Sequence, residues 1–200
     1  MASIEFFFDL SSPWTCLAFH NIQPIARDAG APIDWRPFLV GGVFNAVNQG
    51  VYAARENVNG PKSRPVQGWL EDWARLAGVP MNFPSPHHPL KSVGPMRVCC
   101  ALEERQDELL CFANHAFTAY FEHQRNLDDP DVLTAVATEC GFEGEALVRH
   151  SGEQDIKDRL RSNTQEAIDR GAFGSPTIFV NRTRMYFGND QLPLVEQAIS

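Results

Sequence analysis

The stretch that decides the fold is FFFDLSSPWTCLAFH, residues 6–20, which begins like a strand and ends like a helix. The nearly all-apolar run from Ile4 to Phe8 is typical of a strand that is covered on both faces of a sheet. Serine is a favoured helix N-cap and proline a favoured first helical residue, so Ser12 and Pro13 predict where the helix begins. The joint between the two elements therefore places a hydroxyl group at a helix N-terminus.

The residues that follow predict one helix and a second strand. Apolar residues recur at helical spacing over residues 14–29, where Pro24 predicts a kink and Gly30 a stop. Residues 33–40 alternate moderately in hydrophobicity, and Pro37 predicts an edge strand because proline cannot donate to a neighbouring strand. Together these elements predict a strand, helix, strand unit.

A long helical region and a second pair of strands complete the chain. Residues 41–65 are rich in Gly, Asn and Pro and predict a loop, and apolar spacing predicts helices over roughly the next hundred residues. One of these helices is marked by Trp69, Leu70, Trp73 and Leu76. Two short β-rich runs at residues 177–180 and 184–187 predict a hairpin, and a final helix is predicted with Asp190 as its N-cap.

This order of elements predicts an α/β fold with one sheet made from both ends of the chain. Consecutive sheet elements tend to be adjacent, and crossovers between parallel strands are right-handed. We therefore expect a thioredoxin-like fold interrupted by an inserted α-helical domain, with residues 1–60 and 171–200 in the first domain and residues 61–170 in the second. In thioredoxin-like folds the first turn carries Cys-Pro-x-Cys, whereas here Ser12 and Thr15 occupy both cysteine positions.

The composition is that of an ordinary globular protein and argues against several classes of function. The 200 residues are 44% hydrophobic and 21% charged, which suits one domain with a sizeable core or one domain with an insertion. The net charge of −8, without any long run of Lys or Arg, argues against nucleic-acid binding. The start, MASIEFFFDL, lacks the basic lead of a signal peptide, and no apolar stretch reaches membrane-spanning length. We therefore expect a cytoplasmic protein without membrane contact.

The cysteines and histidines predict neither a disulfide framework nor a metal site. The five cysteines are an odd number without any CxxC spacing, which argues against a zinc ribbon and a dithiol redox centre. His115 and His123 lie eight residues apart, not the four of a helical zinc motif. Cys16 is a rival nucleophile, but it follows Thr15 and is therefore rotated about 100° further around the helix. We expect Cys16 to pack inside the protein.

The hydroxyl group of Ser12 allows two interpretations that can hold together. It can cap the helix, and it can donate a hydrogen bond to the thiolate of a bound molecule at the electropositive helix end. Lowering a thiol pKa from about 8.5 to about 6.5 needs roughly 2.7 kcal/mol. A helix terminus supplies ~0.3–2 kcal/mol and a hydrogen bond to a charged group ~1.5–3 kcal/mol, so together they suffice. A cis Ser175–Pro176 bond would let the backbone of Ser175 face this helix end and pair with an extended peptide.

Several motifs, spread from about Ile4 to Ile199, resemble those of the 2-hydroxychromene-2-carboxylate isomerase family. They are FFFDLSSPW near the start, GGVF at 41–44, Lys62, P-x-x-S-V-x-x-M-R at 89–97, GSPT at 174–177 and FGND at 187–190. That family is similar to kappa-class glutathione transferases and to the wider disulfide-oxidoreductase A superfamily. The resemblance implies glutathione as the bound thiol and a homodimer as the assembly.

Carried over by position, the resemblance assigns glutathione contacts to both ends of the chain. Ser12 resembles the serine that contacts and activates the glutathione sulfur. Pro176 resembles the cis-proline whose preceding residue, here Ser175, pairs through its backbone with the cysteinyl unit. Asn189 and Asp190 resemble the turn and helix start that hold the γ-glutamyl end, although a simple N-cap would also account for Asp190.

Three further residues resemble family positions nearer the substrate. Lys62 resembles a lysine near the carboxylates of glutathione or substrate, Asn48 a polar glutathione contact, and Arg97 a bidentate partner for a substrate carboxylate. Simpler interpretations are a solvated loop lysine, a turn-forming asparagine and a helix-surface arginine. The chain also departs from the family pattern: it has WLEDWA in place of D-x-x-RWA, and Pro65, Lys91 and Gln191 in place of a common Tyr, Asn and Arg.

These observations lead to one main hypothesis and two alternatives. We expect a glutathione-dependent cis-trans isomerase of 2-hydroxychromene-2-carboxylate or a similar aromatic conjugated ketoacid, in which a thiolate adds reversibly and Ser12 steadies the sulfur anion. Trp14, Phe44 and aromatic residues of the inserted domain are expected to form the apolar walls. A kappa-type glutathione transferase or peroxidase would consume glutathione instead, and a non-catalytic thioredoxin-like binding module would keep Ser12 only as a cap.

Overall fold

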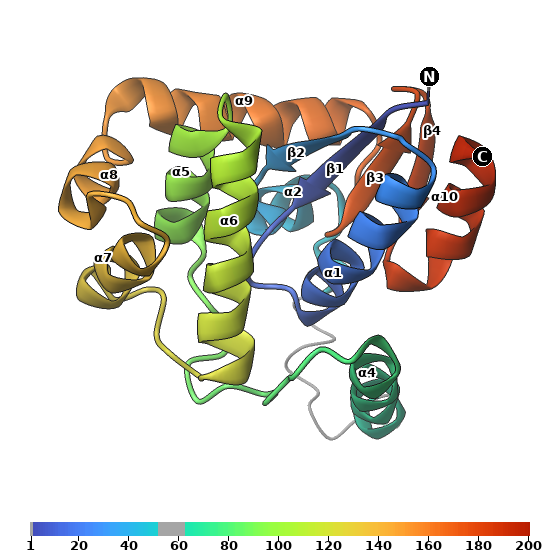
Figure 1. The fold of residues 1–200 in the computed structure, drawn as a ribbon, viewed down its shortest axis with the longest axis horizontal. Coiled ribbons are helices and arrows are strands. Elements are labelled where there is room, and N and C mark those ends of the chain that lie inside the picture. Colours follow the sequence, from blue (N-terminus) through green and yellow to red (C-terminus); the bar gives the residue numbers. More distant parts are fainter. Residues whose placement is uncertain (1, 52–62) are drawn as a thin grey trace.

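Both ends of the chain contribute to one four-stranded sheet, in a computed structural model that describes residues 2–51 and 63–200 (Figure 1). The strand order is β2-β1-β3-β4. Strand β1 (Ile4–Phe8) pairs in parallel with β2 (Ile33–Pro37) and antiparallel with β3 (Thr177–Val180). Strand β4 (Arg184–Phe187) pairs antiparallel with β3. The α/β prediction, with a sheet built from both ends of the chain, is confirmed.

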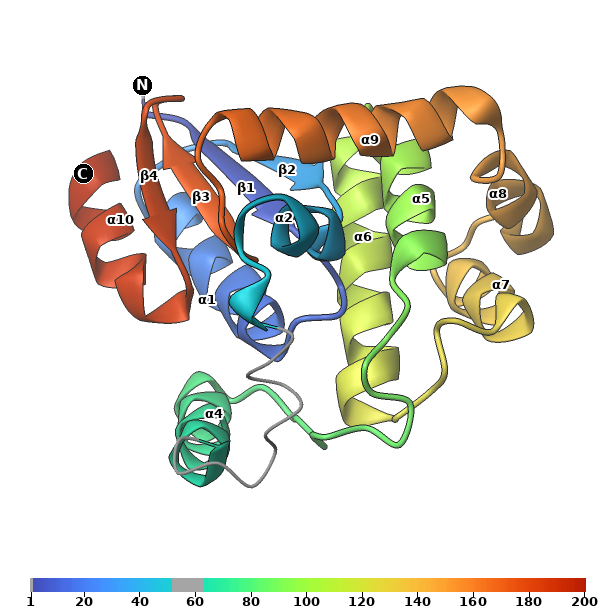
Figure 2. The ribbon, with the colours of Figure 1, turned by 180° about the vertical axis from the view of Figure 1, so that it is seen from behind.

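Helices lie on both sides of this sheet and fill most of the described chain between β2 and β3. In chain order they are α1 (Pro13–Asp28), α2 (Val40–Val47), α4 (Ser63–Ala77), α5 (Val93–Leu102), α6 (Gln106–Phe117), the π-helix η1 (Thr118–Glu122), α7 (Pro130–Glu139), α8 (Gly144–His150), α9 (Gln154–Asp169), the 3-10 helix η2 (Asn189–Gln191) and α10 (Leu192–Ile199). Figures 1 and 2 show α1 and α10 over one face of the sheet, and α2 with part of α9 over the other. The domain limits at residues 60 and 170 stay a prediction.

The first helix and the second strand form where the local signals predict them. Helix α1 begins at Pro13 and continues through Pro24, and the chain leaves it at Gly30 with a φ of +63°. A positive φ costs glycine little because it has no Cβ atom. Strand β2 is an edge strand, as Pro37 predicts, and it ends at that residue.

The predicted loop over residues 41–65 is wrong at both of its ends. Helix α2 begins at Val40, and α4 already begins at Ser63. Adjacent glycines at the start of α2 weaken its local helix signal, but Val40, Val43 and Phe44 recur at helical spacing and are buried. Tertiary burial of that apolar face therefore overrides the low helix propensity of the glycines.

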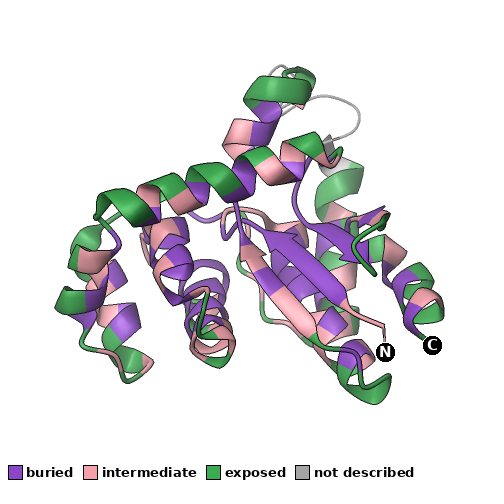
Figure 3. Cartoon of the chain, turned by 90° about the horizontal axis from the view of Figure 1, so that it is seen from above, coloured by how far each residue is buried: buried purple, intermediate pink, exposed green. Residues whose placement is uncertain are grey.

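The aromatic side chains of β1 alternate between two core clusters, one on each face of the sheet. Phe6 and Phe8 pack toward α1, where the ring of Phe19 lies 6.2 and 5.8 Å from theirs. Phe7 packs on the opposite face, with its ring 6.0 Å from that of Phe38. The ring of Phe19 also lies 5.0 Å from that of Phe117 in α6. The helical region and the sheet thus share one core, which Figure 3 shows as buried residues along both.

The C-terminal hairpin has the predicted strands, but the helix after it starts differently. The predicted N-cap role of Asp190 is wrong, because this residue lies inside η2 and α10 begins only at Leu192. Pro193 stands in the first turn of α10, where its missing N–H costs no hydrogen bond, and so favours the later start. Among the helices described, none has the length and apolar character needed to cross a membrane.

Candidate active site

The hydroxyl group of Ser12 lies at the N-terminus of α1, where it accepts one hydrogen bond and donates another. Its Oγ atom accepts a hydrogen bond from the backbone N–H of Thr15 at 3.2 Å, so Ser12 is the N-cap. The same hydroxyl donates to the backbone carbonyl oxygen of Ser175 at 3.3 Å. The first turn of α1 contains no acidic side chain that would offset the positive helix end. Because one N–H already polarises the Oγ atom, its O–H is a strong donor for an anion.

Asp9 fixes the loop that carries Ser12. Its buried carboxylate accepts hydrogen bonds from the backbone N–H groups of Ser11 and Val40, both at 2.9 Å, and from the hydroxyl of Ser92 at 3.0 Å. Burial raises the pKa of the Asp9 carboxyl above its usual value, and these hydrogen bonds partly offset the rise. Three separate segments, the loop itself, α2 and the start of α5, are thereby held around one side chain.

The segment before β3 meets this loop through Ser175. Its buried Oγ atom accepts a hydrogen bond from the backbone N–H of Asp9 at 3.0 Å and lies 2.8 Å from the hydroxyl oxygen of Thr15. The Ser175–Pro176 peptide bond is cis, as the resemblance implies. The structure therefore brings Ser12 together with Ser175 and Pro176, which lie near the opposite end of the chain.

A cleft of about 390 Å³ opens beside Ser175. Its lining residues are Trp14, Val66, Trp69, Trp73, Ser175, Phe187, Gly188, Asn189 and Asp190. Trp14 and the α4 tryptophans Trp69 and Trp73 supply an aromatic wall, in agreement with the expectation for Trp14 and for the helical region. Phe44 does not line this cleft, because it packs in the core cluster around Phe7. The size and the mixture of apolar and polar groups suit a small organic ligand.

Asn189, one of the residues that line the cleft, has a buried side-chain amide whose nitrogen has no partner among the described residues. Asn189 is 2% exposed, and its Oδ1 atom accepts a hydrogen bond from Nδ2 of Asn21 at 2.8 Å. Its own Nδ2 atom has no hydrogen-bond partner among the described residues. A buried donor without an acceptor costs about 1–3 kcal/mol, so this position favours a ligand that brings an oxygen atom. Asp190 follows it, with an exposed carboxylate on the same cleft.

Ser12 and Pro176 do not line this cleft themselves, and neither do Asn48 and Arg97. Asn48 ends α2, and its side-chain amide donates to the carbonyl oxygen of Phe173 at 3.1 Å, so it holds the segment before Ser175. Arg97 lies in α5, and its buried Nε atom has no hydrogen-bond partner within the part of the chain that is described. Lys62 lies outside the described residues. The ligand contacts assigned to these three residues stay predictions.

The thiol nearest to Ser12 along α1 is too buried to act as a nucleophile. Cys16 is 1% exposed, and its burial raises the pKa of its thiol well above the usual range. This agrees with the packing role that its position on the helix indicates. Sequence reasoning missed the contacts of Asp9 and Thr15, although a charged residue directly after a buried strand, and a hydroxyl at the second cysteine position, were available signals.

Comparisons with known proteins agree with this fold. A family model described as the DSBA-like thioredoxin domain matches residues 3–200. A 2-hydroxychromene-2-carboxylate isomerase of Sphingobium xenophagum is 29% identical over 195 residues, covering 97% of this chain and 96% of the relative. Glutathione S-transferase kappa 2 of Caenorhabditis elegans is 25% identical over 203 residues, covering 96% of this chain and 89% of the relative. A solved 2-hydroxychromene-2-carboxylate isomerase structure has a TM-score of 0.81 at 25% identity, and the match covers 98% of this chain and 94% of that structure's chain. The resemblance inferred from the motifs is confirmed.

Proposed function

Because this chain belongs to the DSBA-like thioredoxin domain family, and its relatives include isomerases matched over almost their full length, we propose that it is a glutathione-dependent isomerase. The proposed substrate is 2-hydroxychromene-2-carboxylate or a similar aromatic conjugated ketoacid. The observation that supports this most directly is the hydroxyl of Ser12 in the place where a redox member of the fold has its attacking thiol. Such a site can stabilise a thiolate that another molecule brings, but it cannot form a disulfide with it.

The residues present suit glutathione. Its γ-glutamyl end carries a carboxylate and an ammonium group, which match the unpartnered amide of Asn189 and the exposed carboxylate of Asp190. Its cysteinyl unit is an extended peptide segment that can pair with the backbone of Ser175. The cleft beside these groups is about 390 Å³, which leaves its aromatic wall for a second, apolar molecule.

Ser12 supplies the electrostatic part of the proposed mechanism. Bound glutathione supplies a thiolate that adds reversibly to the conjugated system, which allows rotation about a bond that was double. The Ser12 hydroxyl turns from the carbonyl oxygen of Ser175 toward the sulfur, and gives up only a 3.3 Å hydrogen bond in doing so. The N–H of Thr15 continues to donate to the Oγ atom and so strengthens its O–H as a donor.

The aromatic wall orients the ring of the substrate. Trp14 stands one residue after the helix start, and Trp69 and Trp73 face the same cleft from α4. Flat aromatic surfaces hold a planar conjugated molecule by stacking and exclude water from the reacting bond. The substrate-carboxylate role falls to Arg97, which does not line the cleft, and to Lys62, which lies outside the described residues.

Turnover with thiol accounting tests this proposal. The full-length protein is incubated with 2-hydroxychromene-2-carboxylate, with and without glutathione, while the absorbance of the isomers and the free thiol concentration are followed together. We expect conversion only with glutathione and no loss of thiol over many turnovers. Conversion at an equal rate without glutathione would refute the dependence.

A second candidate function rests on the kappa-class relative of Caenorhabditis elegans, which also matches nearly the whole chain. A transferase or peroxidase of that kind would consume one thiol for each product formed or two thiols for each peroxide reduced. The same assay with an electrophile or a peroxide in place of the chromene separates the two enzymes. Absence of saturable glutathione binding by calorimetry would leave only the non-catalytic binding module.

A further inference from the structure

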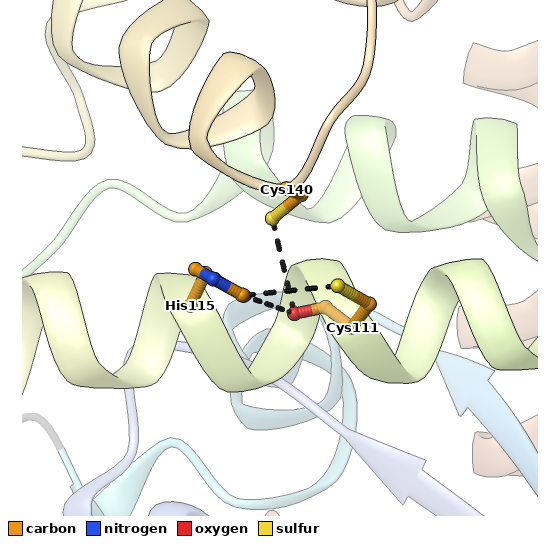
Figure 4. A group of neighbouring side chains, drawn as sticks. All are labelled: Cys111, His115 and Cys140. Atoms are coloured by element: carbon orange, nitrogen blue, oxygen red, sulfur yellow. Dashed lines mark hydrogen bonds between the residues drawn. The ribbon is translucent and has the colours of Figure 1, made fainter.

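A second group of chemically reactive side chains lies away from the cleft, where α6 meets the end of α7. Cys111 and His115 stand four residues apart on α6, and Cys140 directly follows α7 (Figure 4). Residues four apart on a helix share one face. One ligand atom from each of the three side chains, two sulfurs and one imidazole nitrogen, lies within 4.8 Å of the others. None of the three residues lines the cleft beside Ser175.

The spacing of these atoms is close to that of a metal site. The Sγ atom of Cys111 lies 3.8 Å from Nδ1 of His115. With a metal–sulfur bond of about 2.3 Å and a metal–nitrogen bond of about 2.0–2.1 Å, a tetrahedral zinc ion requires this separation to be about 3.6 Å and the sulfur–sulfur separation about 3.8 Å. Shifts of a few tenths of an ångström to about 1 Å in flexible side chains therefore complete the geometry.

The present hydrogen bonds of the group are few and easily replaced. Nδ1 of His115 lies 2.9 Å from the backbone carbonyl oxygen of Cys111, and the thiol of Cys140 donates weakly to the same oxygen at 3.9 Å. The imidazole of His115 and the thiol of Cys140 therefore contact the same carbonyl oxygen. An ion placed between the three side chains would exchange these contacts for three coordinate bonds, while the helix keeps the carbonyl in its own ladder.

The surroundings allow an ion to enter and be neutralised. His115 is exposed, and both cysteines are partly exposed. His115 also borders a surface hollow of about 260 Å³ that includes His123, Arg125 and Glu139. Glu139 is already paired with Arg125 at 2.8 Å, so the charge of a divalent ion would be balanced by the two thiolates. Three protein ligands would leave a fourth coordination position for water.

We propose that Cys111, His115 and Cys140 form a zinc-binding site that links α6 to the end of α7. Two thiolates and one imidazole are ligands that zinc prefers, and three protein ligands leave one coordination position open. The third ligand, Cys140, lies 29 residues after Cys111 at the end of another helix, so no spacing along the chain reveals the site. The ion would cross-link α6 to the end of α7, and its binding would stabilise the folded protein by mass action.

Metal titration of the reduced, chelator-treated full-length protein tests the site. Cobalt is added first as a spectroscopic probe, and zinc is then added to displace it. We expect one equivalent of cobalt to give thiolate-to-metal charge transfer and the intense visible bands of tetrahedral cobalt, and zinc to abolish both. Zinc should also raise the melting temperature of this protein.

Variants locate the ligands. His115→Ala changes an exposed side chain and preserves the fold, so it is the principal variant, and Cys111→Ser and Cys140→Ser complete the set. Each should weaken zinc binding at least about tenfold and remove the zinc-dependent rise in melting temperature. His150→Ala, a partly exposed histidine outside the group, and Ser12→Ala should bind zinc as the wild type does.

Two results would overturn the site. One is unchanged affinity and stoichiometry in His115→Ala, which would show that the ion binds elsewhere. The other is a lack of metal uptake by the reduced protein together with a Cys111–Cys140 disulfide in the unreduced protein, detected by mass spectrometry of peptides. Neither result bears on the isomerase proposal, whose test depends on glutathione and not on metal.

Discussion

The Oγ atom of Ser12 lies 3.3 Å from the backbone carbonyl oxygen of Ser175, across a sequence separation of 163 residues. This contact joins the turn after β1 to the turn before β3, and β1 and β3 are neighbours in the sheet. The two turns meet because β1 and β3 are antiparallel, so that β1 ends where β3 begins, at the same end of the sheet. The candidate site is therefore a consequence of strand order, and the helices between the two strands add the aromatic wall around it.

Replacing Ser12 by alanine should raise the thiol pKa of bound glutathione. Loss of a hydrogen bond to a charged group, worth about 1.5–3 kcal/mol, corresponds to a rise of about one to two pH units. The same change removes the cap of α1 and should lower the free energy of unfolding by about 1 kcal/mol. Titration of thiolate absorbance in the complex measures the first effect, and chemical denaturation measures the second.

Asp129→Ala is the matched control for this variant, because Asp129 caps α7 through a side-chain bond to the N–H of Asp131. It should lose similar stability and leave the pKa of bound glutathione unchanged. If both variants leave that pKa unchanged, Ser12 is a cap only.

Replacing Asp190 by alanine should weaken glutathione binding without unfolding the protein. Its side chain is exposed and lies on the cleft, so its removal costs little packing. Loss of the pair with the γ-glutamyl ammonium group should raise the dissociation constant by about tenfold or more. Calorimetric titration with glutathione measures this change.

The dipeptide cysteinylglycine, which lacks the γ-glutamyl unit, provides the comparison. If Asp190 holds that unit, wild type and Asp190→Ala should bind the dipeptide equally. An equal loss of affinity for both ligands would instead assign Asp190 to another part of the site.

Local signals along the chain were enough to predict the strands and the first helix. The apolar run of β1, the proline at the start of α1 and the short β-rich runs of the hairpin depend on neighbouring residues alone. Helix α2 was missed because its glycines mask an apolar face that only tertiary burial reveals. Helix α4 was predicted from its apolar spacing, yet Trp69 and Leu76 are 58% and 77% exposed. Periodicity identifies a helix, but it does not show which part of its apolar face is covered.

For the candidate site too, local signals were enough for some residues and not for others. Ser12 and Pro176 stand beside strong turn signals, and the family resemblance assigned them together. The carboxylate of Asp9 and the unpartnered amide of Asn189 gain their roles only from partners distant in sequence, such as Ser92 and Asn21. No pattern along the chain predicts such a contact without the packed structure.

Replacing Gly174 by alanine should destabilise the protein, since a Cβ atom there would lie 2.6 Å from Cε2 of Phe187. This contact is far below van der Waals distance, and overpacking of this kind costs about 1–3 kcal/mol. Because Ser175 follows directly, glutathione affinity should fall as well. Gly68→Ala in α4 is the control: nothing lies within 4 Å of its Cβ position, so the variant should gain about 0.5–1 kcal/mol. Equal unfolding free energies for the two variants, measured by chemical denaturation, would contradict the predicted clash.

The buried carboxyl group of Asp9 should make stability depend on pH in a defined direction. Burial raises its pKa in the folded protein above that of the unfolded chain, so the folded state binds the proton more tightly. The stability that this group contributes is therefore fully present below the unfolded pKa of about 3.9, and it is lost as pH rises through the folded pKa.

Comparison with Asp9→Asn, which does not titrate, isolates this effect. The difference in unfolding free energy, wild type minus variant, should fall as pH rises from about 4 and level off above the folded pKa, with a slope of at most about 1.4 kcal/mol per pH unit. The variant keeps one side-chain oxygen, whereas Asp9 accepts hydrogen bonds with both of its oxygens. Oδ1 accepts from Ser11, and Oδ2 accepts from Val40 and Ser92. This lost acceptor shifts the whole curve by a constant and leaves its slope unchanged. A difference that rises with pH would mean that the hydrogen bonds outweigh burial, and that Asp9 is held as a carboxylate beneath the Ser12 turn.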